Sequence, residues 1–393
     1  MEFKTLLEAL RLVCILLPDD YNFLIYAANT QYDGRRLTAA LLNEGRCPNS
    51  IADDLWHHIV FLRNRTDILS TFLVADGVSC LCDITTSLGR ISPVESLTWH
   101  NAAAKFSQSK ELMRAMEDWV TKIFENLLCP IRRYNAIEAS SLISSSATIK
   151  SSSSRDSKVR SRILARDGVA SPLGGAIDRS APHDIRQSAP DRVAKLEAAH
   201  IMPIMLSKYP LMQKLLSMFA GTNGEAVLRG KLINSPSNIF CTDHDTHLLF
   251  DEFIVGIQYL NEQYLLCKVV QEEAQGTISR CQDGEEVIFG TGPCGHEIDL
   301  PDGELFNIHL AIAKVLHASG AGEVISKILQ DEEDFNEGVL EDGPSAARIS
   351  AFALRMALQE VQAASDSAES PRTTTDCDDD NSWNKQQEHG RGV

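Results

Sequence analysis

Hydrophobic residues recur at helical spacing in two parts of the N-terminal third of the chain. The first series is Leu6, Leu7, Leu10, Val13 and Leu17, and the second is Leu112, Met116, Trp119, Ile123 and Leu127. Steps of three and four residues predict amphipathic helices. We therefore expect residues 1–138 to be mainly helical. His57 and His58, on the segment 52–60, favour an exposed helical face over a metal site.

The pattern changes after residue 138. Residues 139–157 are rich in serine and include the runs 144–146 and 151–154. Such a segment buries too little apolar surface to offset its chain entropy, so it is expected to be a flexible linker.

The second half alternates short helical and strand-like patterns. Helices are predicted over 158–167, 210–219, 302–316 and 348–361, and short strands over 263–270, 276–281 and 285–289. Pro210 suits the first position of its helix, and Asp302 suits the cap of another that ends near Ser319 and Gly320. Glycine and proline make 168–195 loop-like. The chain is therefore expected to be an α+β protein.

These patterns give a division of the chain. The helical N-terminal region (1–138) and the linker (139–157) precede a domain over 158–325, and C-terminal helices follow over 326–363. Residues 364–393 are rich in Ser, Thr and Asp and predict a disordered acidic tail.

Composition restricts the function classes. The net charge is −17, from 37 Lys and Arg against 54 Asp and Glu, so contact with nucleic acid requires a local basic patch. The 10 cysteines show no Cys-x-x-Cys pair, which favours reduced thiols in a core. We find neither a signal-peptide pattern nor a run of about 20 apolar residues. The expected location is intracellular, without a choice between nucleus and cytoplasm, and without membrane contact.

Polar groups in apolar surroundings mark two candidate stretches. His200 ends an apolar segment that begins at Leu196, just before Pro203, which is typical of a strand end. Alone, such a histidine is more often a core residue than a functional one. Asn238 and His247 form the second stretch with Asp251.

His247 and Asp251 have the spacing of neighbours on one helical face, if a helix begins near Leu248. An imidazole and a carboxylate so placed suit a divalent cation, with open positions for water and phosphate. A hydrolytic nuclease needs such a metal together with a base that deprotonates water. His200 is the candidate base.

A basic run precedes these stretches. It contains Lys150, Arg155, Lys158, Arg160, Arg162 and Arg166. A solvated helix face and a phosphate-binding patch explain this run equally well. The second alternative makes Arg160, Arg162 and Arg166 candidate nucleic-acid contacts.

Together the segments 162–168, 196–201, Asn238 and 247–251 resemble the HNH endonuclease family, whose fold is called ββα-metal, and its fungal-type branch in particular. The segment 300–321 extends the resemblance, which covers about residues 158–325. It implies a β-hairpin carrying His200 and a helix presenting His247. It also implies that His200 is the general base, that Asn238 braces the loop orienting it, and that His247 binds one metal ion. Asp251 stands where some members have a further ligand.

The chain departs from the family pattern in three places. Ala199 stands where many members have a metal-binding acidic residue, although Ala-Ala-His-Ile is similar to the fungal-type wording. Glu197, on the same strand face as Ala199, is a candidate replacement ligand; its alternative is a solvent-facing residue. The segment after Arg166-Asp167-Gly168 lacks a cysteine, and the stretch between the two motifs is long. His244 is a weaker candidate ligand, because the residues before His247 are expected to form a loop.

Two functions follow. The first is a DNA endonuclease that hydrolyses phosphodiester bonds with a divalent metal ion (Mg, Mn or Zn) at His247 and Asp251. The second is a catalytically decayed HNH fold that serves as a nucleic-acid-binding or protein-binding regulatory module. Ala199 and the acidic total support the second. Protein partners and oligomeric state are left open.

Overall fold

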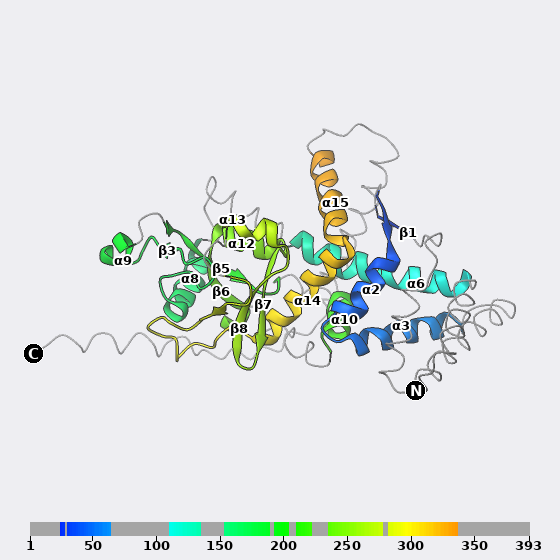
Figure 1. Ribbon diagram of the computed structural model, residues 1–393, viewed down its shortest axis with the longest axis horizontal. Helices are drawn as coiled ribbons and strands as arrows, with labels where there is room; N and C mark the ends of the chain where they lie inside the picture. Colours follow the sequence, from blue (N-terminus) through cyan, green and yellow to red (C-terminus); the bar gives the residue numbers. More distant parts are fainter. Residues whose placement is uncertain are drawn as a thin grey trace, which may run out of the picture.

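The computed structural model describes residues 24–27, 30–63, 110–134, 153–188, 192–203, 210–221, 235–277 and 282–336. The series at 6–17, most of the serine-rich linker, the helix expected at 348–361 and the acidic tail lie outside these ranges. Figure 1 shows how the described elements are arranged, with the helices of the N-terminal part on one side and the mixed helix and strand part on the other.

The N-terminal part is mainly helical where it is described. A small hairpin of β1 (Leu24–Ala27) and β2 (Thr30–Asp33) leads into α2 (Gly34–Glu44) and α3 (Pro48–Arg63). Helix α6 (Lys110–Ile123) continues through the π-helical turn η1 (Phe124–Leu128) to residue 134. The indole nitrogen of Trp119 donates to Asp54 at 2.9 Å and links α6 to α3. The helices at 52–60 and 112–127 are thereby confirmed, whereas the hairpin was not predicted.

The next segment builds a hairpin with a helix before it and a helix after it. Helix α8 (Ser153–Asp167) confirms and extends the helix expected at 158–167. Strand β5 (Leu196–His200) pairs antiparallel with β6 (Ile239–Asp243), and α12 (His244–Asp251) follows β6 directly. Residues 168–195, expected to be loop-like, also hold two short parallel strands, β3 (Ile177–Asp178) and β4 (Val193–Ala194), and helix α9 (His183–Ser188).

Helix α10 (Pro210–Ala220) lies between the two motifs and begins at the proline, as expected. It buries Leu215, Leu216 and Phe219. The long stretch between the motifs is therefore partly helical, and its helix packs with the N-terminal helices α3 and η1.

A three-stranded antiparallel sheet follows α12. Its order is β7 (Val255–Leu260), β8 (Gln263–Lys268) and β9 (Glu286–Val287). Two of the three expected strands, at 263–270 and 285–289, are confirmed with shorter bounds. The strand expected at 276–281 is wrong at its start, because α13 (Gln271–Thr277) is helical up to residue 277. Its two acidic residues in the first turn, Glu272 and Glu273, favour a helix there.

Helix α14 (Gly303–Ser319) has the ends that the sequence predicts. The Asp302 carboxylate accepts a hydrogen bond from the Glu304 N–H at 2.8 Å, and Gly320 ends the helix in the left-handed conformation, at φ +74°. Helix α15 (Ala321–Asn336) follows at once. Gly303 must be glycine because a Cβ there would lie 2.1 Å from the ring of Tyr259.

One cluster of buried side chains joins the two parts of the chain. It contains residues of α2, α3 and α6 together with residues of β6, α12, β7, α14 and α15, from Leu37 to Ile328. At its centre the rings of Phe240, Phe250 and Phe306 meet edge to face, with centroids 4.9–6.1 Å apart. The buried side chains of α12 therefore pack in a core to which the N-terminal helices also contribute.

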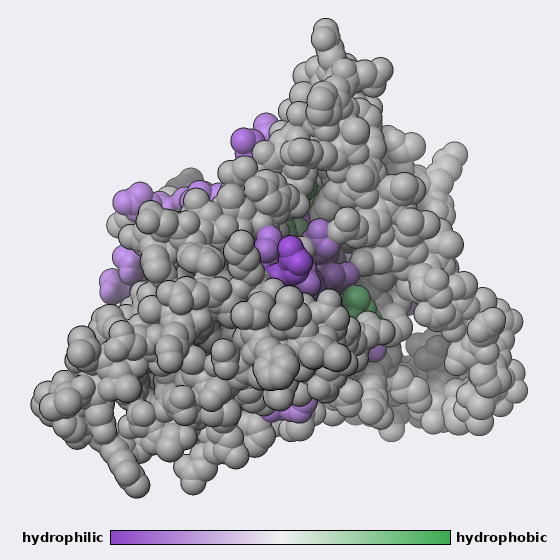
Figure 2. Space-filling view, turned by 90° about the vertical axis from the view of Figure 1, so that its right-hand side faces the viewer, coloured by the Kyte–Doolittle hydropathy of each residue, from purple (hydrophilic) through white to green (hydrophobic). Residues whose placement is uncertain are grey.

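The surface combines hydrophilic and hydrophobic residues. On the face shown in Figure 2 the coloured residues are mostly hydrophilic, with small hydrophobic areas. Among the described residues, no helix combines the length and the apolar character needed to cross a membrane.

Candidate functional site

His200 is the last residue of β5, as the sequence predicts. Its backbone is paired opposite Ile239, the first residue of β6. Burial lowers the pKa of His200 to about 4, and the charge of His247 acts in the same direction. The ring is therefore neutral at pH 7 and able to accept a proton.

The two faces of the β5–β6 hairpin have different neighbours. Leu196, Ile239 and Cys241 pack with Ile163 of α8 on one face, while Ala199 and Phe240 join the large core on the other. Alternation along the strand thus places Glu197 and Ala199 on the face towards α12, and starts the His200 side chain on the α8 face. The charge of His247 nevertheless affects the pKa of His200.

Asn238 fixes the backbone just after His200. Its side-chain oxygen accepts a hydrogen bond from the Met202 N–H, and its amide nitrogen donates to the Met202 carbonyl, both at 2.9 Å. Its own carbonyl accepts from the Ile201 N–H at 2.8 Å. Asn238 is 1% exposed, so these bonds are shielded from water. This geometry is what a residue that braces the His200 segment requires.

Helix α12 begins earlier than the sequence suggested. Asp243 caps it, accepting from the Thr246 N–H at 3.1 Å, so His244 is already its first residue. The expectation of a loop before His247 is therefore wrong, and the reason is the Asp243 cap. His244 and His247 consequently lie three residues apart on the same helix and face the same strand.

Glu197 lies between the two histidines. Its Oε2 accepts from Nδ1 of His247 at 3.3 Å and from Nδ1 of His244 at 3.4 Å, both long hydrogen bonds. Burial raises the pKa of Glu197, but the hydrogen bond and charge of His247, followed by those of His244, lower it overall. Glu197 is therefore an ionised acceptor that faces the site, and the alternative of a solvent-facing residue does not fit its position.

Asp251 lies at the other side of the His247 ring. Its Oδ2 is 3.4 Å from Nε2 of His247, and both side chains are buried. A protonated His247 donates from Nε2 to Asp251, whereas a neutral ring with its proton on Nδ1 presents the lone pair of Nε2 to the carboxylate, an arrangement that suits a cation between them. Two ligands about 2.1 Å from one tetrahedral ion are about 3.4 Å apart, so this pair has the spacing and the donor chemistry of two metal ligands.

The three expected ligands do not form one metal-binding group. Glu197 and Asp251 contact opposite nitrogens of the same imidazole, so a single ion bound to one nitrogen cannot reach both carboxylates. Within the ranges that the structure describes, no group of three or more His, Cys, Asp or Glu side chains is arranged to hold a metal ion. Among the described residues, His247 and Asp251 are thus the pair whose spacing suits one ion.

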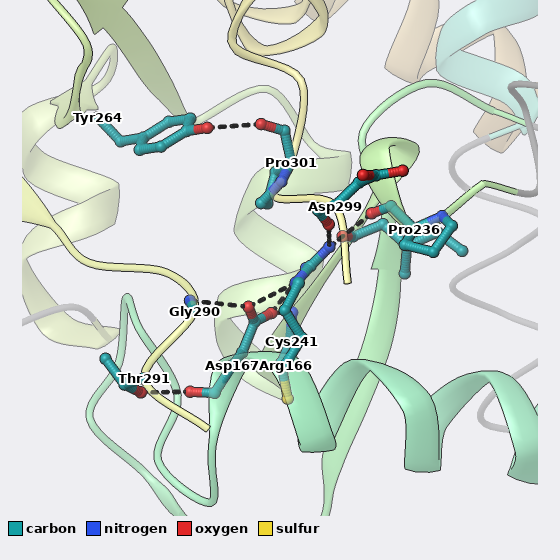
Figure 3. Close-up of polar contacts among 10 residues, drawn as sticks. Arg166, Asp167, Pro236, Cys241, Tyr264, Gly290, Thr291, Asp299 and Pro301 are labelled. Carbon is teal, nitrogen blue, oxygen red and sulfur yellow. Dashed lines mark hydrogen bonds and ion pairs between the residues drawn. The ribbon is translucent and has the colours of Figure 1, made fainter. Parts of the chain in front are cut away.

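Two of the three candidate arginines of the basic run make contacts within the protein. Arg166 is fully buried, which does not fit a role in binding phosphate. Its guanidinium pairs with both oxygens of Asp167 at 2.7 and 2.8 Å and donates to the carbonyls of Pro236, Asp299 and Ile239 (Figure 3). Arg160 pairs with buried Asp178 and donates to the Leu196 carbonyl at 2.6 Å. Of the three candidates, Arg162 is exposed.

Asp167 extends this network to the strand and to the loop over 290–300. It accepts from the Cys241 N–H at 3.1 Å and from the Gly290 N–H at 3.4 Å, and its carbonyl accepts from the Thr291 hydroxyl (Figure 3). The Arg-Asp-Gly sequence thus fastens α8 to β6 and positions the hairpin that carries His200 and Asn238. Gly168, at φ +90°, provides the left-handed turn that ends α8.

Sequence reasoning missed one polar contact at the end of α12. Arg132 donates from its Nη1 to the carbonyl oxygen of Asp251 at 3.0 Å, across 119 positions of sequence. An arginine between Ile131 and Arg133 gives no signal for such a long-range contact. It becomes apparent only once the N-terminal helices are packed against α12.

Comparison with known proteins agrees with this geometry. Residues 179–258 match the family model described as HNH endonuclease, a segment that includes β5, β6 and α12 and therefore His200, Asn238 and His247. The match is to the HNH endonuclease family and does not support the expected fungal-type branch. The curated proteins and the solved structures gave no match.

Proposed function

We propose that this protein is a metal-dependent HNH-type endonuclease that hydrolyses phosphodiester bonds in DNA. One observation carries the proposal: inside the matched segment, His200 ends β5, Asn238 braces the backbone beyond it, and His247 on α12 is near enough for its charge to lower the pKa of His200. Neutral His200 accepts a proton from the attacking water at a ring nitrogen. Asn238 keeps the His200 segment in place while that proton moves.

The residues at His247 suit a divalent ion, Mg²⁺, Mn²⁺ or Zn²⁺. His247 Nε2 and Asp251 Oδ2 are the proposed ligands, and Glu197 becomes a partner that holds the proton on Nδ1 and so directs Nε2 towards the ion. When bound, such an ion stabilises negative charge on the scissile phosphate and on the leaving oxygen. This assignment retains His247 and Asp251 as ligands and gives Glu197 an orienting role.

DNA is the proposed substrate because the HNH family model implies it. Of the three candidate arginines on α8, exposed Arg162 remains available to meet phosphate, whereas Arg160 and Arg166 stabilise the hairpin. With a net charge of −17, the protein is expected to bind DNA weakly and in a salt-dependent way.

Plasmid cleavage tests the proposal. Purified protein is incubated with supercoiled plasmid and Mg²⁺, Mn²⁺ or Zn²⁺, and wild type is compared with His200→Ala and with His183→Ala, a control at an exposed histidine of α9. We expect nicking by wild type and the control, and a loss of at least about a hundredfold in His200→Ala. Cleavage that survives His200→Ala would remove His200 as the base.

A second function is favoured by a different observation. Ala199 fills the position where many HNH members have an acidic ligand, and its side chain is buried in the core. A protein with this site decayed would be a DNA-binding or protein-binding regulatory module. Wild type that binds DNA in gel-shift assays but cleaves in none of the three metals would support this alternative.

A further inference from the structure

The C-terminal end of α12 has an unusual backbone conformation. The helix closes with two hydrogen bonds, from the Ile254 N–H to the Leu249 carbonyl and from the Phe253 N–H to the Phe250 carbonyl, both at 3.0 Å. This pairing normally places glycine at the left-handed position. Here the residue is Phe253, at φ +62°, which an L side chain rarely adopts.

A phenylalanine keeps that conformation only where its surroundings determine it. Helix α14 supplies two such contacts. The ring of Phe253 stacks on His309 at 4.6 Å, and its carbonyl oxygen is 3.0 Å from Nε2 of His317, which donates to it. The same His309 ring stacks on Phe250, at 3.7 Å and 5°.

The third contact comes from the N-terminal helices. Arg132, half-buried, donates to the Asp251 carbonyl at 3.0 Å and to the Ser326 hydroxyl of α15 at 3.4 Å. The negative charges of Glu252, Asp251 and Glu273 favour the cationic form of Arg132, and a cation at the end of a helix also stabilises its exposed carbonyls. Figure 1 shows the helix that carries Arg132 reaching towards α12 and α13.

We propose that Arg132 is a positioning residue for the candidate metal site: by binding the Asp251 carbonyl it fixes where the Asp251 side chain meets His247. The N-terminal helical region then belongs to the working site. The inference rests on the proposed function in its metal-binding part only. The anchoring of α12 stands on the contacts of Arg132, His309 and His317.

The test uses the full chain with Arg132→Met, Arg132→Lys and a control, Arg114→Met, at an exposed position of α6. Backbone hydrogen exchange of metal-free protein is measured at Glu252, Phe253 and Ile254. In Arg132→Met we expect exchange there to be about tenfold faster, with α8 unchanged, because the end of α12 opens locally. Arg132→Lys keeps one donor and the charge, so it is expected to lie between Arg132→Met and wild type.

Binding of Mn²⁺, followed by electron paramagnetic resonance, supplies the second measurement. We expect Arg132→Met to weaken Mn²⁺ binding by about tenfold, Arg132→Lys to restore part of it, and Arg114→Met to bind as wild type. A merely structural role would leave Mn²⁺ affinity unchanged in the folded variants, and that result would overturn the positioning role.

The failures are distinguishable. Wild type that binds no Mn²⁺ contradicts the metal in the proposed function and removes the role of Arg132 at that metal, while hydrogen exchange still decides the anchoring. If residues 252–254 of Arg132→Met exchange their backbone hydrogens at the wild-type rate, the anchoring role is overturned, regardless of the Mn²⁺ affinity. If Arg132→Met does not fold, Arg132→Lys carries both measurements, and wild-type values in that variant overturn the proposal.

Discussion

The side chain of Asn238 occupies both backbone hydrogen-bonding groups of Met202: its oxygen accepts from the N–H and its nitrogen donates to the carbonyl, each at 2.9 Å. Met202 is itself buried, so neither group has water as an alternative partner. The conformation of the chain just after His200 therefore depends on one amide side chain.

We expect Asn238→Ala to lower the free energy of unfolding by roughly 2–4 kcal/mol, because two buried backbone groups lose their partners. The control is Asn307→Ala, since Asn307 makes the same double contact with the backbone of Tyr259 but remains part-buried. Urea unfolding measures stability and plasmid nicking measures activity. Both variants lose stability, and Asn238→Ala alone is expected to lose cleavage beyond its loss of folded protein. Equal cleavage by the two would contradict the bracing role.

Measuring the Mn²⁺ affinity of two variants distinguishes the orienting role of Glu197 from the ligand role of Asp251. Glu197→Gln removes the carboxylate that accepts from His247 Nδ1, so we expect Mn²⁺ binding to weaken by about 10- to 100-fold and not to disappear. Asp251→Asn removes a proposed ligand and should weaken binding more. Isothermal titration calorimetry checks the order of the two. A Glu197→Gln variant weaker than Asp251→Asn would return Glu197 to the set of ligands.

Stability should fall in mild acid because of His200. Its pKa is about 4 in the folded protein and about 6.5 when unfolded, so between these values the unfolded chain binds the extra proton. The contribution is complete above about pH 6.5 and is lost towards pH 4, a change of roughly 3 kcal/mol if the whole difference is expressed. Unfolding is measured in urea at pH 7.5 and pH 5 for wild type and His200→Gln.

The stability difference between pH 7.5 and pH 5 should shrink in His200→Gln and stay unchanged in the control His183→Gln. His309, fully buried with a pKa lowered to about 3, adds a pH dependence of the same sign that both variants retain. An identical pH dependence in wild type and His200→Gln would contradict the low pKa of His200.

Arg166 and Arg162 lie on the same helix but should respond differently to replacement. Arg166→Met leaves Asp167 as a buried carboxylate without its partner, which is expected to cost about 3–5 kcal/mol of stability. Arg162→Met, at an exposed position, is expected to change stability by less than about 0.5 kcal/mol and to weaken DNA binding at low salt. Thermal unfolding and fluorescence anisotropy with labelled DNA make the comparison. A stable Arg166→Met would contradict the structural role of the pair.

The sequence predicts the strand and helix of the candidate site better than the long-range contacts around them. The apolar segment ending at His200 and the four-residue step from His247 to Asp251 are local patterns, and both are present as a strand end and a helix face. The cap and the end of α14 were also readable, because Asp302 and Gly320 act on their immediate neighbours.

What the sequence does not reveal depends on partners far along the chain. In the sequence, Arg166 looks like Arg162, because both are arginines of the same basic run. Only the carbonyl acceptors of residues 236, 239 and 299 in the structure distinguish the buried Arg166. The contact between Arg132 and the Asp251 carbonyl has no sequence signature at all, since any residue offers a carbonyl. The early start of α12 is hard to predict because the polar residues 243–246 are typical of a loop, and the hydrogen bond from the Thr246 N–H to Asp243 makes them a capped helix.

The shared core has a consequence for how such a nuclease-like segment passes between genes. Residues 179–258 carry the histidines and the asparagine, yet the side chains that support α12 also come from helices at both ends of the described chain. A gene fragment encoding that segment alone would transfer the chemical groups without the packing that holds them. The heritable unit of this site is therefore expected to include its flanking helices, and duplication or exchange should preserve them together.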